Sequence, residues 1–345
     1  MRRHAFLIGF LSLIFGLVPL SFGLVAGAST ALASPQCWDT ASGLTAKVVA
    51  KSNQLIGGVI DATGCDVGVY VGAGVTGVLI QHATISNAND EAILVQDTWD
   101  VGIANNTVIH NDVAVHTSIA EDKAISLVGS SHVTVDHNLV TDTVGSGGIG
   151  VYDDGAVDPS GLKPGMSLPG NNNWVTDNQV VNNLTDCGII VAAFNAGKTG
   201  GVSGNVIQGN TVSNNVSGIV LAANGPGVVV SNNYVLWNTV TDNGINGIIL
   251  HSNAPGSAIS GTVIHRNTVS GNGADPEVGL THPNGIILAG STFGPNTPPA
   301  VVTNTYVTYN WVKNEYFGVA EINAQNSSVL GWALIHATVP VFTTP

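Results

Sequence analysis

Residues 205–221 read Asn-Val-Ile-Gln-Gly-Asn-Thr-Val-Ser-Asn-Asn-Val-Ser-Gly-Ile-Val-Leu, and this pattern recurs along the chain. The copies align on a leading Asn, which is Asn210 in this stretch. Most copies are followed by Gly-Ile-x-Leu or a close variant, here Gly218-Ile219. A unit that recurs at this interval is typical of a repeat architecture. The leading residues are Asn106, Asn138, Asn178, Asn210, Asn238, Asn267 and Asn310.

Two apolar positions flank every leading Asn. The residue two places after it is always Val, the residue three places before it is Val or Ile, and the positions between them are mostly polar. This alternation is typical of short strands with one buried face. β-Branched residues favour such strands because they pack well on a pleated surface. The copies begin 28 to 43 residues apart, which leaves room for three strands, tight turns and insertions.

The sequence therefore predicts an all-β fold, a single-stranded parallel β-helix of three-strand coils with about 9–10 turns. Each coil hydrogen-bonds to the next, so matched valines stack about 4.8 Å apart in the interior. The leading Asn residues are expected to stack as a side-chain amide ladder that also bonds the turn backbone.

The Asn-x-Val-x-x-Asn … Gly-Ile-x-Leu pattern resembles the right-handed parallel β-helix repeat of the pectate-lyase-like superfamily, over about residues 54–335. The resemblance implies a right-handed helix. It does not imply one activity, because that superfamily includes lyases, hydrolases, epimerases, tailspikes and proteins without an assigned activity. Motifs of its enzyme branches are largely missing. Asp153-Asp154 stands in an unmatched context, and Arg266 is the one arginine after the first three residues.

The chain is expected to begin with an export signal that has a basic start, a long apolar run and a small-x-small site at Ala31-Leu32-Ala33. An uncleaved anchor is the alternative. Caps are expected at both ends of the solenoid, because its terminal coils would otherwise expose core and strand edges. The expected segments are signal peptide 1–33, N-terminal cap 34–53, β-helix repeats 54–328 and C-terminal closing segment 329–345.

The charge balance excludes one class of partner. The chain has 22 acidic and 9 basic residues and a net charge of −13. Nucleic-acid binding requires many Lys and Arg side chains, so that class is rejected. A polyanionic substrate is disfavoured unless a cation bridges the two negative surfaces. We expect a secreted, extracellular protein without a membrane segment after signal removal, as a monomer or small homo-oligomer.

Export also bears on the cysteines. Cys37 and Cys65 lie near the mature N-terminus, where an oxidising compartment favours a disulfide. Two unpaired buried thiols are the alternative.

Acidic residues in the third to fifth coils are the candidate catalytic groups: Asp153, Asp154, Asp97 and Asp122. In the repeat alignment Asp97 and Asp153 share a column two coils apart, about 10 Å from the strand spacing. Paired carboxylates can hydrolyse a glycosidic bond by acid and base catalysis. Alternatively, Asp153, Asp154 and Asp158 form a Ca²⁺ site. A third interpretation is that these are solvated turn residues, since Asp is common in turns.

Candidate substrate contacts are Tyr152, His116 and Lys123 near those acids, and an outward aromatic stripe of Trp174, Tyr234 and Tyr306. Exposed rings with a polar handle can stack on sugars. The alternative for the stripe is packing between neighbouring strands.

A nonpolar outward column is also expected on the third strands. It seats a loop or a neighbouring subunit, or it reflects β-propensity alone. Its members are Ile190, Val220, Ile249 and Ile287.

Two functions fit these features. One is a glycan hydrolase or lyase that acts on extracellular polysaccharide in an acidic groove. The other is a non-catalytic glycan-binding or structural surface module. An enzyme requires carboxylates that converge within roughly 5–10 Å. A binding module requires an exposed aromatic stripe without that convergence.

Overall fold

The computed structural model describes most of the chain that follows the expected export signal. That signal, residues 1–33, lies outside the described residues. Within the described residues, no helix is long and apolar enough to cross a membrane. The structure describes residues 36–114, 123–154, 168–194, 201–331 and 335–344.

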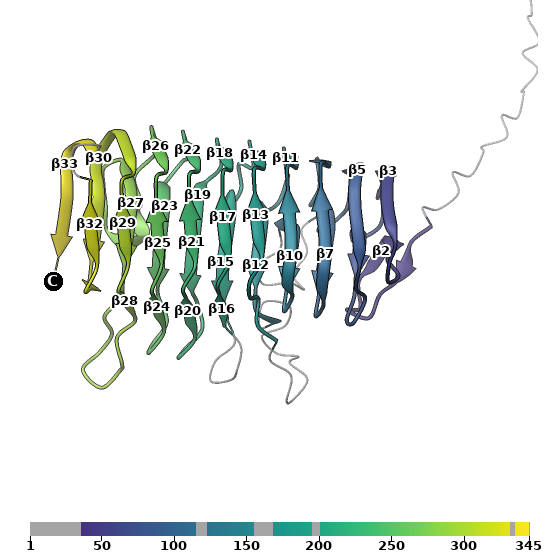
Figure 1. Cartoon of the computed structure of the whole chain (residues 1–345), viewed down its shortest axis with the longest axis horizontal. Helices are drawn as coiled ribbons and strands as arrows, with labels where there is room; N and C mark the ends of the chain where they lie inside the picture. Colours follow the sequence, from purple (N-terminus) through teal and green to yellow (C-terminus); the bar gives the residue numbers. More distant parts are fainter. Residues whose placement is uncertain (1–35, 115–122, 155–167, 195–200, 332–334, 345) are drawn as a thin grey trace, which may run out of the picture. The chain divides into compact units, whose positions relative to one another are not determined.

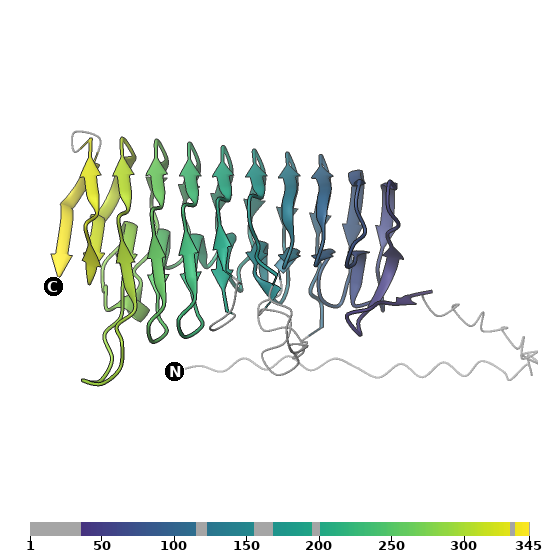
Figure 2. The same ribbon diagram turned by 60° about the horizontal axis from the view of Figure 1, so that its bottom comes forward.

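Short parallel strands form almost all of the regular structure, and strands of successive coils lie side by side (Figures 1 and 2). The first sheet contains β3 (Leu55–Asp61), β5 (Val78–Ser86), β7 (Trp99–Ala104), β10 (Ser131–Asp136), β13 (Trp174–Thr176), β17 (Val206–Gln208), β21 (Tyr234–Leu236), β25 (Val263–His265), β29 (Tyr306–Thr308) and β32 (Ser328–Leu330). The second sheet, which β5 also enters, contains β8 (Thr107–Ile109), β11 (Leu139–Thr141), β14 (Gln179–Val181), β18 (Thr211–Ser213), β22 (Thr239–Thr241), β26 (Thr268–Ser270), β30 (Trp311–Ile322) and β33 (Ile335–Thr344).

The third sheet is the longest, and the second halves of β30 and β33 complete it. Its other strands are β2 (Thr45–Val49), β4 (Val67–Val71), β6 (Ile93–Gln96), β9 (Lys123–Val128), β12 (Gly147–Tyr152), β15 (Ile189–Ala193), β19 (Ser217–Ala223), β23 (Asn246–Ser252) and β27 (Asn284–Ala289). A small fourth sheet contains β16 (Val202–Ser203), β20 (Val229–Ser231), β24 (Ala258–Ser260), β28 (Val301–Thr303) and β31 (Ala324–Gln325).

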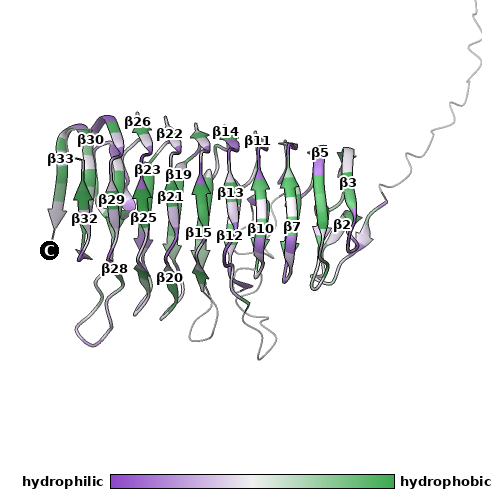
Figure 3. Cartoon of the chain, viewed as in Figure 1, coloured by the Kyte–Doolittle hydropathy of each residue, from purple (hydrophilic) through white to green (hydrophobic). Residues whose placement is uncertain are grey.

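The strand registers confirm the predicted parallel β-helix. The valines two places after each leading Asn are paired from coil to coil, for example Val140 with Val180 and Val212 with Val240. All four of these side chains are fully buried in one continuous core. Buried and more exposed residues alternate along strands such as β5 and β10, so one face of each strand packs on the core. Figure 3 shows apolar (green) and polar (purple) stretches along the ribbons.

Buried amide side chains connect the coils at the turn between the first and second sheets. The Nδ2 of Asn178 donates to Oδ1 of Asn210 at 3.0 Å, and its Oδ1 accepts from both the main-chain N–H and Nδ2 of Asn138 at 2.9 Å. The same side-chain bond joins each leading Asn to the next, and none of the seven is more than 2% exposed. These bonds satisfy polar groups that would be costly to bury alone.

The corners of the coils require a left-handed backbone. Among the described residues, 24 non-glycine residues have positive φ, and most are Asn, Asp or His. These residue types tolerate that conformation best after glycine. Several corners pair an Asn or Asp with a glycine in the next coil: Oδ1 of Asn232 lies 2.5 Å from the position that a Cβ on Gly261 would occupy.

The glycine of the Gly-Ile motif faces the core. A Cβ on Gly247 would lie 2.5 Å from Cγ1 of Val269 and 2.5 Å from the carbonyl oxygen of Gly285. A side chain at this position would therefore displace the valine column or the neighbouring coil. This contact explains why glycine precedes the buried isoleucine in most copies.

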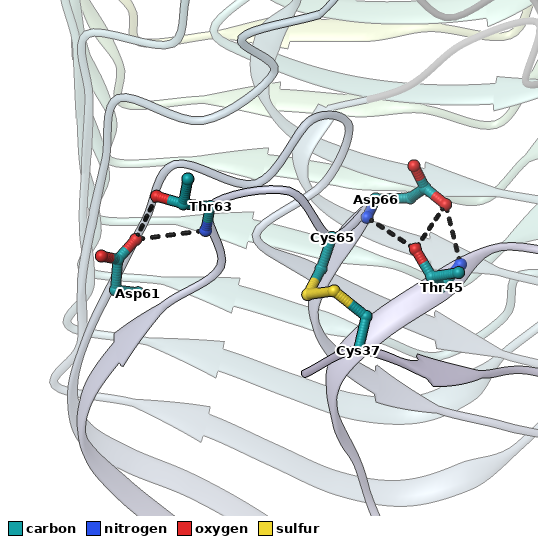
Figure 4. Close-up of a disulfide and its surroundings, with 6 residues drawn as sticks. All are labelled: Cys37, Thr45, Asp61, Thr63, Cys65 and Asp66. Atoms are coloured by element: carbon teal, nitrogen blue, oxygen red, sulfur yellow. Dashed lines mark hydrogen bonds between the residues drawn. A yellow bond between two sulfur atoms is a disulfide. The ribbon is translucent and has the colours of Figure 1, made fainter. Parts of the chain in front are cut away.

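A disulfide and an antiparallel pair hold the N-terminal end. β1 (Trp38–Asp39) pairs antiparallel with β2, and Cys37 is bonded to Cys65 with their Cα atoms 5.6 Å apart (Figure 4). Nearby, Oδ2 of Asp66 accepts from both the main-chain N–H and the hydroxyl of Thr45 at 2.8 Å. The disulfide is thus formed, where the sequence left two alternatives open. β2 lies within the range expected for the cap and already pairs with β4.

Candidate functional site

The candidate acids Asp97 and Asp153 follow strands that are in register. Gln96 pairs with Val128 and Val128 with Tyr152, so Asp97, Gly129 and Asp153 occupy one position in three successive coils. Asp153 is fully buried, and one of its carboxylate oxygens accepts the main-chain N–H of Phe194 at 3.0 Å. Asp154 is 9% exposed. Both carboxyl groups are therefore part of the folded interior of this corner.

Asp97 has the geometry of a corner residue. Its φ is 54°, and its Oδ1 lies 2.5 Å from the position that a Cβ on Gly129 would occupy. The same position is 3.1 Å from Cβ of Asp154, which brings the two acids together around this glycine. Asn232 covers Gly261 in the same way, so the arrangement around Asp97 does not require a catalytic role.

Lys123 is held in an ion pair rather than on an open surface. Its side chain is fully buried, and its Nζ lies 2.8 Å from Oδ2 of Asp186. Burial raises the pKa of Asp186, but the Lys123 ammonium and hydrogen bonds outweigh it and hold that pKa below its usual value. A Cβ on Gly147 would lie 2.8 Å from Cδ of Lys123, so the glycine makes room for this lysine.

Tyr152 is fully buried, and its ring packs against Phe194 with the centroids 6.1 Å apart.

The nonpolar column of the third sheet is buried as well, and Ile249 and Ile287 belong to the same apolar cluster as Leu280. Leu280 lies just beyond the 3-10 helix η2 (Pro276–Val278), in the segment between β26 and β27. A loop therefore contributes to the cover of this column, as one of the sequence alternatives expected.

Three candidate residues, Asp122, His116 and Asp158, lie outside the described residues. The expected Ca²⁺ set is therefore described only at Asp153 and Asp154.

The aromatic stripe is exposed. Trp174 and Tyr234 are 40% exposed and Tyr306 is 50% exposed. The strand registers place all three in one outward column, and two of its positions carry valines between them. Neighbouring rings of the stripe are two coils apart, which corresponds to about 10 Å. The stripe has the placement that the repeat alignment predicted, and its role in binding remains a prediction.

More aromatic side chains lie beside this stripe: Trp237 and Tyr309, which the repeat places at the adjoining turn, and Trp311, which the sequence did not assign to the site. Trp237, Tyr309 and Trp311 are each about half exposed. His265 stands edge-on to both Trp237 and Tyr309, with centroids 6.0 and 5.9 Å away, and its Nδ1 is 2.7 Å from Oγ1 of Thr308. Trp237 and Tyr309 lie at left-handed corners, where the other described coils mostly have Asn, Asp or His. We call Tyr234, Trp237, Tyr306, Tyr309 and Trp311 the aromatic platform.

A group with metal-ligand spacing lies at the corners of two neighbouring coils. Ligand atoms of Asp136, His137 and Asp177 all lie within 4.8 Å of one another. His137 Nδ1 is 2.7 Å from Oδ2 of Asp136, and this hydrogen bond and charge raise the pKa of His137. An imidazole with two carboxylates suits divalent transition metals. His137 and Asp177 occupy the same position in neighbouring coils, one residue before Asn138 and Asn178, and Asp136 precedes His137. The sequence did not assign this group to a site.

Part of the chain matches a known family model. The model for the periplasmic copper-binding protein NosD matches residues 46–189, which is less than half of the chain. No curated protein sequence matches the chain.

Several solved structures are similar at low sequence identity. An exopolygalacturonase from Thermotoga maritima is 11% identical with a TM-score of 0.49, and the match covers 80% of this chain and 53% of that one. The catalytic domain of a GH87 α-1,3-glucanase is 14% identical with a TM-score of 0.38 and coverages of 86% and 57%. A mannuronan C-5 epimerase module from Azotobacter vinelandii is 13% identical with a TM-score of 0.35 and coverages of 84% and 89%. The chain thus spans only about half of the first two proteins, and its parallel β-helix fold rests on the strand registers described above.

Proposed function

We propose that this chain is a secreted protein that binds extracellular polysaccharide through the aromatic platform. The observation that supports this proposal most directly is the exposed column that contains Tyr234 and Tyr306, two coils apart on a parallel sheet. Flat rings with a polar edge stack on the apolar faces of sugars and keep their hydroxyls in water. The distance of about 10 Å between them is comparable to a disaccharide unit of an extended glycan.

The placement of the acids favours binding over catalysis. Asp153 is fully buried and Asp154 almost so, and Asp97 sits over Gly129 as a corner residue. A hydrolase or lyase remains the second candidate because Asp97 and Asp154 meet at that glycine. Secretion is supported by the export signal and by the Cys37–Cys65 disulfide, which is typical of oxidising compartments.

Binding is tested with the mature chain on a glycan array, followed by calorimetry with each glycan that is retained. Tyr306→Ala and Tyr234→Ala are each expected to weaken binding by about fivefold or more, if a ring stacked on a sugar contributes about 1–3 kcal/mol as it does on a nucleic-acid base. Trp99→Ala is the matched control, because Trp99 is 55% exposed but lies on the distant strand β7. Equal losses in all three variants, or no retained glycan, would refute the proposal.

Catalysis is tested separately on the same polysaccharides, with assays for reducing ends and for unsaturated products. Turnover that Asp153→Asn abolishes, while binding and the melting temperature persist, would establish the enzymatic candidate. Binding without products would leave the chain as a non-catalytic glycan-binding module.

A further inference from the structure

Three residues break the rule that governs the corners of this fold. Of the 24 described non-glycine residues with positive φ, all are Asn, Asp or His except Trp237, Arg266 and Tyr309. The three follow residues that are paired in register, Leu236 with His265 and His265 with Thr308. They therefore occupy the same corner of three successive coils.

The preceding coils fill this corner with residues that suit its backbone. His137 and Asp177 have φ of 52° there, and Gly209 has φ of 69°. A bulky side chain in the left-handed region costs on the order of 1–3 kcal/mol. Three such costs at one place indicate that the side chains are retained for the surface that they present rather than for the turn.

The corner presents two exposed rings, and an exposed arginine comes from the coil between them. Trp237 is 47% and Tyr309 53% exposed, and Arg266 occupies the coil between theirs. His265 lies edge-on to both rings, and its bond to Thr308 fixes its orientation. The rings are therefore supported from the side by a neighbouring side chain, which limits the entropy that a ligand must remove on binding.

Arg266 has no carboxylate partner among the described residues, although acidic residues outnumber basic ones 22 to 9. In the next coil, Nζ of Lys313 lies over the ring of Trp311, 4.8 Å from its centroid. The negative charge of the rest of the chain acts weakly here, because exposed charges beyond about 8–10 Å are screened at physiological salt. Arg266 is thus an exposed cation without a carboxylate partner among the described residues of an acidic protein.

We propose that the corner formed by Trp237, Arg266 and Tyr309 is a subsite for negatively charged sugar units of the bound polysaccharide. The rings stack on the sugar faces, and the planar guanidinium pairs with a carboxylate or sulfate group by two parallel hydrogen bonds. This inference rests on the proposed function and names the substrate class of the same surface. It replaces the expectation from net charge alone, under which a polyanionic substrate required a bridging cation.

The test compares glycans that differ only in charge. Calorimetry or affinity electrophoresis of the mature chain is run with polygalacturonate against its methyl ester, and with dextran sulfate against dextran. Arg266→Asn is the main variant because Asn is the ordinary residue at these corners, so the fold is expected to persist. Arg266→Lys retains the charge without the planar pair of donors, and Lys51→Asn removes an exposed charge at the N-terminal end.

We expect the anionic member of at least one pair to bind about tenfold more tightly than the neutral member at low salt. Arg266→Asn should abolish that preference, Arg266→Lys should retain part of it, and Lys51→Asn should leave it intact. The pair that shows the preference identifies carboxylate or sulfate as the ligand. If both members of each pair bind equally and Arg266→Asn changes nothing, this inference fails while the proposed function stands. If no glycan binds, both fail.

Discussion

Glu315 occupies the position of an asparagine at the end of a buried amide ladder, and its Oε1 accepts both the main-chain N–H and the Nδ2 of Asn272 at 3.0 Å. The preceding coils place Asn183, Asn215 and Asn243 in the same ladder. The carboxyl group is thus enclosed where the rest of the ladder has neutral amides.

Stability should fall with rising pH because of this carboxyl group. Burial, with a smaller contribution from the charge of Asp242, outweighs the Asn272 hydrogen bonds and raises the pKa of Glu315 from 4.5 to about 7. The folded state therefore prefers the protonated form. The contribution is complete below about pH 4.5 and is lost as pH rises through 7. Glu315→Gln should remove this dependence and be more stable at pH 8 by up to about 3 kcal/mol.

Denaturant unfolding at pH 5 and pH 8 measures the effect, with Asp39→Asn as an exposed carboxyl control. A wild-type pH dependence that persists unchanged in Glu315→Gln would contradict the prediction.

Removing one amide from the ladder of leading asparagines, between the first and second sheets, should destabilise the fold strongly. Asn178→Ala would leave the carbonyl oxygen of Val135, Oδ1 of Asn210 and the N–H groups of Asn138 short of partners. Buried groups left in this state cost about 1–3 kcal/mol each. Thermal and denaturant unfolding should show a loss of about 3 kcal/mol or more. Gln179→Ala, the exposed neighbour, should change the free energy of unfolding little; equal effects would refute the role of the ladder.

A methyl group on the inward glycine column should overpack the core. Gly247→Ala places a Cβ against Val269 and the backbone of Gly285 and should cost about 1–3 kcal/mol. Gly294 has no neighbouring atom within 4 Å of its Cβ position and no positive φ, so Gly294→Ala is the control. The melting temperatures of the two variants test this prediction. A Gly247→Ala variant as stable as wild type would contradict it, because the neighbouring coils would then accommodate the methyl group without cost.

The disulfide should stabilise the N-terminal coils. Cys37 and Cys65 are 28 residues apart, and closing a loop of that size contributes about 3.5 kcal/mol in the chain-entropy model. Cys37→Ser with Cys65→Ser should unfold at lower temperature than wild type. Mass spectrometry after thiol alkylation should label one cysteine in the unreduced, denatured chain and three after reduction. A Cys187→Ala variant should keep the full sensitivity to reductant, and labelling of three thiols without reduction would exclude the bond.

The repeat pattern was sufficient to predict the fold because each coil must match the next one in side-chain packing and in hydrogen bonding. Val140, Val180 and Val212 recur at one position because a parallel stack places them in contact, and Asn178 recurs because its amide completes the bonds of Asn138. Such information is local to each copy. The alignment therefore also predicted the outward column of Tyr234 and Tyr306.

The candidate site was harder to predict, because exposure depends on segments outside the repeat. Tyr152 was expected to offer its ring to a substrate, but it is buried against Phe194, which lies in the next coil beyond β15. Lys123 finds its partner in Asp186, 63 residues away. The corner residues Trp237 and Tyr309 were visible as aromatics, but their strain emerged only from the backbone angles.

The matched corners and ladders also limit how this chain can change its length. An extra residue within Thr211–Ser213 would move Asn210 and Asn215 out of step with their partners on both sides. A duplicated stretch of 28 residues, the interval from Asn210 to Asn238, would instead supply a new amide to receive one bond and donate the next. The solenoid would then be longer by one whole turn. A smaller insertion would disturb these bonds least where the chain leaves the third sheet, as between Gly290 and Ala300, which is closed by the bridge between Ser291 and Ala300.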